Sequence, residues 1–217
     1  MNGISWEHFL CDIKQIQNIS QHLNDDWEIV SVNNEVSGTY LTKTISLPFA
    51  IEGGSNEIIE RTIQPPNKFE EEDYLSFESP SQASNSITKQ LLKFEYHVLY
   101  HISYAVPYLC FNAYKSNGSL LTLDEAWKIF NDFGPLKSNP IQQNMLNILT
   151  QMEHPILFKP FLTLHPCRIA EVLHSLPHSQ NKVLSFLSSY GPTIYLTFDL
   201  EYANQIENNN KETNKFT

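Results

Sequence analysis

The sequence predicts an α+β fold in one domain, and three patterns carry this prediction. Residues 5–23 repeat apolar side chains at spacings of three and four, which is typical of an amphipathic helix. Residues 94–104 alternate two sets of side chains with the period of a strand. Helix-like runs follow residues 122 and 169. We therefore expect an N-terminal helix, an antiparallel sheet of about four or more strands, and C-terminal helices.

Two segments after the first helix predict the start of the sheet. Ser5 is placed to cap that helix, and Asn24-Asp25-Asp26 supplies a turn after it. The segments at 27–32 and 39–48 are rich in β-branched and aromatic residues, and NNEVSG separates them. This pattern indicates a β-hairpin.

The middle of the chain predicts a long strand and then a short helix. The strand expected at 93–105 continues into an extended segment, which ends in the turn sequence Ser116-Asn117-Gly118. The capping box Thr122-Leu123-Asp124-Glu125 marks a helix start, and Gly134-Pro135 marks its end.

The last third of the chain is predicted to return to the sheet before it becomes helical. Residues 144–152 are apolar but ambiguous, whereas 156–164 are aromatic and β-branched enough for an extended segment. Helices are expected at 169–176 and 181–190. The catalytic loop, if there is one, falls between the extended segment and the first of these helices.

Two regions lack a periodic pattern. From about Ala50 to Ser86 the sequence is interrupted by Gly-Gly, Pro-Pro and an acidic run, and most of it is predicted to be a mobile insertion, centred on about 65–86. Residues 204–217 are polar and are predicted to form a disordered tail. The single domain is therefore expected to span residues 1–203.

Charge and hydropathy exclude several kinds of partner. The chain has 14 Lys and Arg against 24 Asp and Glu, a formal net charge of -10, which would repel phosphate backbones and anionic lipid headgroups. No run approaches the roughly 20 apolar residues of a membrane span, and no secretory signal is visible at the N-terminus. We expect a cytoplasmic protein with no nucleic-acid partner and no stable membrane insertion.

A zinc site is disfavoured by the spacing of its potential ligands. The candidates that cluster in the sequence are His165, Cys167, His174 and His178. The last two would share a helix face only if the helix continued through Pro177, which lacks an amide proton and clashes with the preceding turn. His97 and His101 have helical chelate spacing, but on a strand they stand about 13 Å apart. They are expected on a polar strand face.

The local sequence leaves the role of Cys167 open. Cys11, Cys110 and Cys167 include no CxxC pair, so reduced thiols are expected. Cysteine is often buried, and packing is the simplest interpretation of Cys167. A protease site would need a base and an orienting group, and no such triad can be identified, although His154 and His165 could supply a base.

The residues on either side of Cys167 nevertheless favour a reactive thiol. Pro166 fixes its own backbone at a junction between an extended segment and a helix. A thiol near the start of that helix, beside Arg168, would be stabilised as the thiolate. A thiolate in this position could act as a nucleophile.

Four blocks occur in a fixed order across most of residues 90–200: KFEYHVLYHISYAVPYLCF, GSLLTLDEAW, QMEHPILFKPFLTLHPC and, more weakly, FLSSYGPTIYL. In this order, and with the E-H-P-I-L and L-H-P-C blocks closely spaced, they resemble the autophagy-related protein ten family of ubiquitin-conjugating-type carriers. The region at 50–86 has no matching block.

The resemblance implies a ubiquitin-conjugating-enzyme-like fold and a carrier that needs no cofactor. It implies that Cys167 accepts the C-terminal glycine of a ubiquitin-like modifier, autophagy-related protein twelve, as a thioester from autophagy activating enzyme seven. The modifier would then pass to a lysine of autophagy-related protein five. Ordinary ubiquitin carriers use the asparagine of a His-Pro-Asn motif here, and this sequence instead has His165 and Tyr104 at the family positions expected to support transfer.

An alternative within the same fold is a catalytically inactive binding module that uses an exposed strand for its partners. By residue pattern alone, Tyr104 is a core aromatic of an alternating strand. His165 is, by the same argument, a hydrogen-bonded structural residue. These interpretations compete with the catalytic ones.

Overall fold

The chain is built on one antiparallel β-sheet with helices packed against it. The computed structural model describes residues 3–32, 38–52, 58–60, 87–133, 149–166 and 169–213. Within these ranges seven strands pair in the order β1-β2-β4-β5-β7-β6, and β3 pairs with β2. The strands are β1 (Glu28–Ser31), β2 (Thr39–Glu52), β3 (Ile58–Glu60), β4 (Ile87–His101), β5 (Val106–Tyr114), β6 (Leu149–Glu153) and β7 (Pro160–Leu164).

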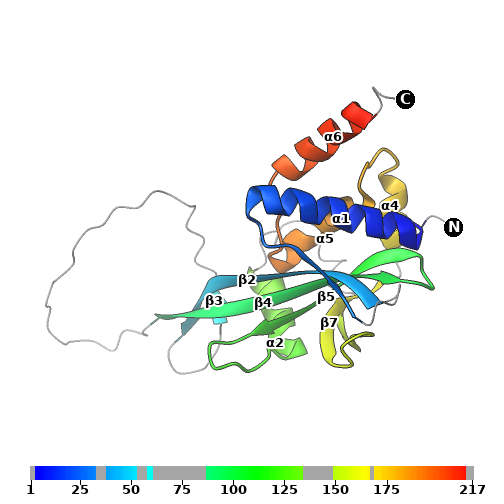
Figure 1. The fold of residues 1–217 in the computed structure, drawn as a ribbon. Coiled ribbons are helices and arrows are strands. Elements are labelled where there is room, and N and C mark those ends of the chain that lie inside the picture. The colour runs from blue at the N-terminus through cyan, green and yellow to red at the C-terminus, as the bar shows by residue number, and fades with distance from the viewer. Residues whose placement is uncertain are drawn as a thin grey trace, which may run out of the picture.

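Four of the five α-helices in the described ranges begin and end near the positions that the sequence predicts, and α6 is the exception. The helices are α1 (Trp6–Leu23), α2 (Leu123–Phe133), α4 (Ile169–Ser175), α5 (Lys182–Tyr190) and α6 (Glu201–Thr213), with a 3-10 turn η3 (Gly191–Ile194). Figure 1 shows α1 and α5 along the same face of the sheet. No helix in the described part of the chain is long and apolar enough to cross a membrane.

Local capping explains why two of these helices start where they do. The Ser5 hydroxyl accepts the N–H of His8 at 3.1 Å and so caps α1. At α2 the capping box is complete, because Thr122 donates its N–H to the Glu125 carboxylate at 2.9 Å and accepts the N–H of Glu125 at 3.2 Å. Both predictions from the sequence are confirmed.

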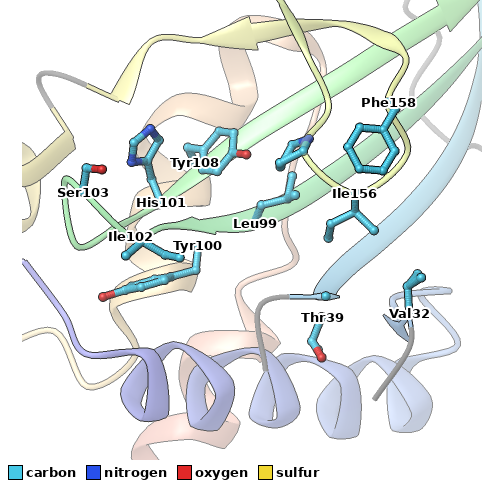
Figure 2. Close-up of a pocket in the computed structure, with 12 residues that line it drawn as sticks. Val32, Thr39, Leu99, Tyr100, His101, Ile102, Ser103, Tyr108, Ile156 and Phe158 are labelled. Atoms are coloured by element: carbon cyan, nitrogen blue, oxygen red, sulfur yellow. The ribbon is translucent and has the colours of Figure 1, made fainter. Parts of the chain in front are cut away.

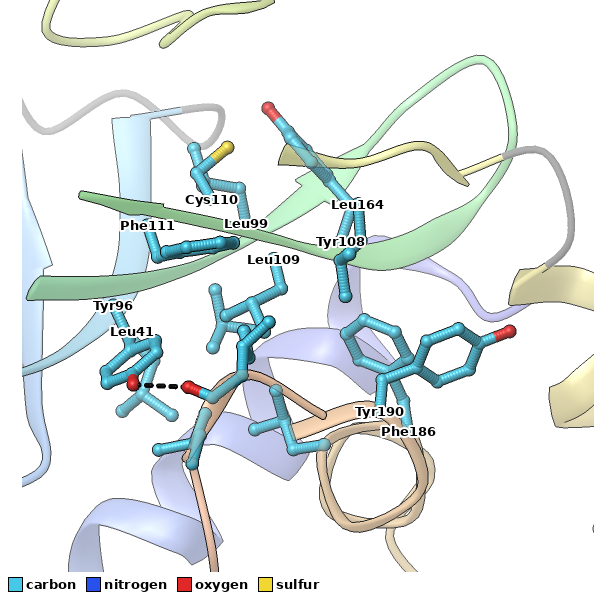
Figure 3. Close-up of a cluster of buried hydrophobic side chains, with 14 of the residues drawn as sticks. Leu41, Tyr96, Leu99, Tyr108, Leu109, Cys110, Phe111, Leu164, Phe186 and Tyr190 are labelled. Carbon is cyan, nitrogen blue, oxygen red and sulfur yellow. Dashed lines mark hydrogen bonds between the residues drawn. The ribbon is translucent and has the colours of Figure 1, made fainter. Parts of the chain in front are cut away.

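The apolar core lies between the sheet and the helices. Figure 3 shows side chains of β4 and β5 meeting Phe186 and Tyr190 of α5. Tyr96 is fully buried, and its hydroxyl donates to the carbonyl oxygen of Ile194 at 2.7 Å. A buried phenol needs such a partner, so this bond fixes η3 against the sheet.

A buried carboxylate ties α1 to α5. Asp12 is only 2% exposed, and it accepts the N–H groups of Lys182 and Val183 at 2.8 and 3.1 Å. These donors belong to the first turn of α5, where the amide protons have no partner within the helix. Burial is the main cause that raises the pKa of Asp12, and the two amides oppose it.

The structure confirms the α+β fold and corrects three boundaries. The hairpin expected at 27–48 is β1 and β2, but β2 continues to Glu52, and β3 pairs with it inside the region expected to be irregular from about Ala50. The strand expected at 93–105 ends at His101. The extended segment expected at 156–164 becomes β7 only at Pro160.

The predicted disordered tail at 204–217 is wrong for residues 204–213, which belong to α6. Tyr202 and Ile206, four residues apart, are 1% and 4% exposed. The Tyr202 hydroxyl also donates to Asp25 at 2.7 Å. These two buried side chains lie on one face of α6 and anchor it to the rest of the fold, although its other residues are mostly polar. The insertion predicted at about 65–86 lies outside the described residues, as do residues 214–217.

Candidate active site

Strand pairing brings two segments that are distant in sequence to the same end of the sheet. β5 pairs with β7 through Cys110 opposite Thr163 and Phe111 opposite Leu162. Because the two strands are antiparallel, the chain leaving β7 runs toward the start of β5. The turn between β4 and β5 therefore lies near His165, which follows the last residue of β7.

Tyr104 and His165 meet at this end of the sheet. Their ring centroids are 6.3 Å apart, and the ring planes are inclined at 72°. Tyr104 is 46% exposed and lies in the β4–β5 turn, so it is not a core aromatic of a strand. Cys167 and Arg168 lie outside the described residues. The chain itself places Cys167 two residues after His165.

His101 is a third member of this aromatic group. Its ring centroid is 4.8 Å from that of Tyr104 and 5.5 Å from that of Tyr108. The Tyr104 N–H points to His101 Nδ1 at 3.4 Å, a long hydrogen bond. Burial, and then the Coulomb interaction with His165, lowers the pKa of His101, which favours the neutral ring. The sequence interpretation had placed His101 on a polar strand face and missed these contacts.

Neither of the described cysteines competes well as the nucleophile of this site. Burial raises the pKa of Cys110 to about 12, so its thiol is protonated at neutral pH. Its Sγ lies 3.3 Å from Thr163 Oγ1 in the pairing between β5 and β7. Cys11 is exposed on α1. Cys110 is therefore core filling.

A pocket of about 420 Å³ opens beside the aromatic group. Figure 2 shows His101 and Tyr108 on one side of it and Ile156 and Phe158 on another. Ile102 and Phe158 are each 73% exposed. The remaining lining residues are Val32, Gly38, Thr39, Leu99, Tyr100, Ser103 and Pro155. No periodic pattern in the sequence could have shown this pocket, because its walls come from three separate connections.

A buried pair of histidines supports one wall of the pocket. His154 is 0% exposed, and its Nδ1 accepts the N–H groups of Ile156 and Leu157 at 3.2 and 3.1 Å. The proton of the neutral ring therefore sits on Nε2, which donates to Nδ1 of His97 at 3.0 Å. His97 in turn donates from Nε2 to Glu95 at 3.1 Å.

This network assigns structural roles to two histidines that the sequence left open. His97 is 2% exposed, so it is not on a polar surface, and His154 is fully occupied in the turn between β6 and β7. His154 is therefore not the base of a protease triad. Within the described ranges, no three His, Cys, Asp or Glu side chains are arranged to hold a metal ion.

The network should make the fold sensitive to acid. Burial, and then the Coulomb interaction with His97, lowers the pKa of His154 from 6.5 to about 4. The unfolded chain takes up a proton on His154 below about pH 6.5, whereas the folded chain does so only near pH 4. The stabilisation is therefore fully present above about pH 6.5 and is lost as the pH falls toward 4. We expect a loss of about 2 to 3 kcal/mol between pH 7 and 4.5 from this residue.

Chemical denaturation at several pH values checks this expectation. His154→Asn keeps an oxygen that can accept an amide proton but cannot titrate, so its free energy of unfolding should change less over the same interval. Hydrogen bonding with His97 is the main cause that lowers the pKa of Glu95, and that carboxylate contributes mostly below pH 4.5. If the free energy of unfolding changed equally with pH in the parental and His154→Asn proteins, the role of His154 would be contradicted.

Comparison with known proteins identifies the family of the chain. Residues 7–201 match the family described as autophagocytosis associated protein, active-site domain. The ubiquitin-like-conjugating enzyme ATG10 of Homo sapiens is 32% identical over 197 residues, which is 85% of each chain. The enzyme of the same name from Arabidopsis thaliana is 30% identical over 51% of this chain and 52% of its own. That from Dictyostelium discoideum is 30% identical over 55% of this chain and 56% of its own.

The match spans every described element from α1 to the first residue of α6. It therefore includes the β4–β5 turn with Tyr104 and the end of β7 with His165. The chain belongs to the autophagocytosis-associated protein family with this active-site domain, the family of the ubiquitin-like-conjugating enzymes of autophagy.

Proposed function

We propose that this protein carries a ubiquitin-like modifier as a thioester on Cys167 and transfers it to a lysine of a target protein. The meeting of Tyr104 and His165 is the observation that carries the proposal. These two residues come from segments far apart in sequence. His165 is two residues before Cys167, and Tyr104 contacts the ring of His165. Family membership supports the same class of reaction.

In the loading step, the Cys167 thiolate attacks the carbonyl carbon of a thioester held by an activating enzyme. A carbon–sulfur bond to Cys167 forms, and the bond to the activating enzyme's sulfur breaks, so that sulfur leaves as a thiolate. The number of thioesters is unchanged. This step therefore needs an accessible thiolate and little other help from the protein.

In the transfer step, the neutral amine of a lysine attacks the same carbonyl carbon. A carbon–nitrogen bond forms, the Cys167 thiolate leaves, and the amine gives up a proton. We assign the orientation of the incoming lysine or of the thioester to the Tyr104 hydroxyl. His165 is assigned the hydrogen bond to the developing oxyanion or the transfer of the proton.

The partners follow from the family resemblance. The modifier is autophagy-related protein twelve, the source of its thioester is autophagy activating enzyme seven, and the acceptor is a lysine of autophagy-related protein five. Ile102 and Phe158 line the pocket and are exposed, as is the neighbouring Tyr104, and we assign the approach of the target to these side chains.

A loading assay tests the proposal. The purified chain is incubated with the activating enzyme, ATP and the modifier, and the products are separated with and without a thiol reductant. A slower-migrating adduct that the reductant removes is expected. A chain that binds the modifier or the target but never forms this adduct would instead be the inactive binding module.

A further inference from the structure

We infer that the N-terminal residues Gly3 and Ile4 are positioning residues for lysine transfer, because they hold the β4–β5 turn that carries Tyr104. The inference rests on the function proposed above for Tyr104. It concerns a segment that lies about 100 residues before the turn in the sequence. We call the contacts of Gly3 and Ile4 with Tyr100 and Ala105 the N-terminal clasp.

The backbone of Ile4 is hydrogen-bonded to both ends of the turn. Its N–H donates to the carbonyl oxygen of Ala105 at 2.7 Å, and its carbonyl oxygen accepts the Tyr100 hydroxyl at 2.7 Å. The Ile4 side chain is buried at 7% exposure. The backbone of one residue thus links Tyr100 and Ala105, which flank residues 101–104.

The Tyr100 side of the clasp is fixed by α1. The ring of Tyr100 packs against those of Trp6 and Phe9, with centroids 5.5 and 5.6 Å away. Figure 2 shows Tyr100 lying between the turn and α1. Ser5 caps α1 directly after Ile4, so the segment that holds the turn continues into a rigid helix.

The Ala105 side holds a backbone conformation that alanine rarely adopts. Its φ is 52°, in the left-handed region, which is strained for a residue with a Cβ. Within the turn its N–H makes only a long bond, 3.3 Å, to the Ile102 carbonyl oxygen. The shorter bond from Ile4 is therefore the contact that keeps Ala105, and with it the adjacent Tyr104, in place.

Gly3 lies too close to the turn for any side chain. A Cβ at this position would lie 2.1 Å from the carbonyl oxygen of Ala105 and 2.8 Å from its Cβ. Both are atoms of the turn and cannot swing away as a flexible side chain would. A substitution at Gly3 must therefore displace either the N-terminal segment or the turn.

The clasp acts on transfer through Tyr104. Tyr104 is 46% exposed and contacts the rings of His101 and His165, so a shift of the turn moves the Tyr104 hydroxyl relative to His165. A shift of about 1 Å in a positioning group can slow a reaction on the order of 100-fold. Loading does not use Tyr104 and should be unaffected.

The experiment measures single-turnover discharge of preformed thioester onto saturating target. Gly3→Ala should slow discharge about tenfold while loading stays within about twofold. Tyr100→Phe removes the hydroxyl without adding an atom and should slow discharge by a smaller factor, which keeps the test valid if Gly3→Ala fails to fold. In a Tyr104→Phe background neither change should slow discharge further, since both act through that hydroxyl.

Gly191→Ala is the matched control. Its Cβ would lie 2.5 Å from the carbonyl oxygen of Leu196, a similar clash in a different part of the fold. It should lower the thermal midpoint but leave discharge within about twofold. A merely structural role for Gly3 would make both glycine variants behave alike, or would add to the effect of Tyr104→Phe, and either result overturns the inference.

Three failures can be told apart. No loading of the parental chain would reject the proposed function, and the clasp with it. Loading with parental discharge in Tyr104→Phe would reject the role of Tyr104, through which the clasp is inferred to act. Loading and slow discharge in Tyr104→Phe, with parental discharge in Gly3→Ala and Tyr100→Phe, would reject the clasp alone.

Discussion

Replacing Cys167 by serine should remove the reductant-sensitive adduct completely. A serine hydroxyl is a much weaker nucleophile than a thiolate at neutral pH, and any product that it forms is an oxygen ester. The variant should therefore give no adduct, or one that survives the reductant. Electrophoresis of the loading reaction with and without thiol distinguishes the thioester, the ester and the unmodified chain.

The two other cysteines provide the controls for this result. Cys11→Ser changes an exposed side chain on α1 and should load at the parental rate. Cys110→Ala removes a buried thiol whose pKa is raised to about 12, and it should load as far as the variant remains folded. An unchanged reducible adduct in Cys167→Ser would reject Cys167 as the carrier residue. Loss of the reducible adduct in Cys11→Ser would indicate that Cys11 carries the modifier.

All the described helices except α6, and most strands, could be predicted because their signals are local. Ser5 and the capping box at Thr122 and Glu125 satisfy amide protons within three residues, so the sequence near each helix start contains the whole interaction. The alternation in β4 follows the face that carries Phe94, Tyr96 and Val98, all at 0% exposure, although His97 and Leu99 on the opposite face are buried as well.

The alternating pattern does not mark the end of β4 at His101. Alternation continues through Ile102 and Tyr104, and no glycine or asparagine marks a turn. The chain nevertheless turns, and Ala105 takes a positive φ held by the N–H of Ile4. A pattern restricted to neighbouring residues contains no trace of a hydrogen bond to residue 4.

Some residues of the candidate site were indicated by the sequence, and the roles of others were not. The family resemblance singled out Tyr104 and His165, and the structure brings these two together. His101 and His154 were visible as polar residues, but their roles depend on rings and amides from other elements. In α6, two buried residues among many polar ones are too few to predict a helix.

Tyr104→Phe and His165→Ala should slow transfer to lysine far more than they slow loading. Loading exchanges one thioester for another and requires mainly the Cys167 thiolate. Transfer must also move a proton and stabilise negative charge on the carbonyl oxygen, and a group that does either contributes roughly 10²- to 10³-fold. We expect each variant to lose transfer rate in this range while loading changes by less than about threefold.

The transfer rate is best measured by a single-turnover experiment. Each variant is loaded, the activating enzyme is stopped, and loss of the thioester is followed after target is added. Circular dichroism shows whether the sheet that leads into the turn is still folded. Tyr108→Phe is a matched control, since it removes a hydroxyl from a buried tyrosine that also packs against His101.

The double variant tells how the two groups work. If Tyr104 and His165 support the same step through their contact, the combined loss should be smaller than the product of the two single losses. Independent roles, with one group orienting the lysine and the other handling the proton, predict losses that multiply. Parental discharge in both single variants would leave Tyr104 as an exposed turn residue and His165 as a structural histidine after β7, and another group near Cys167 would have to support attack by the lysine.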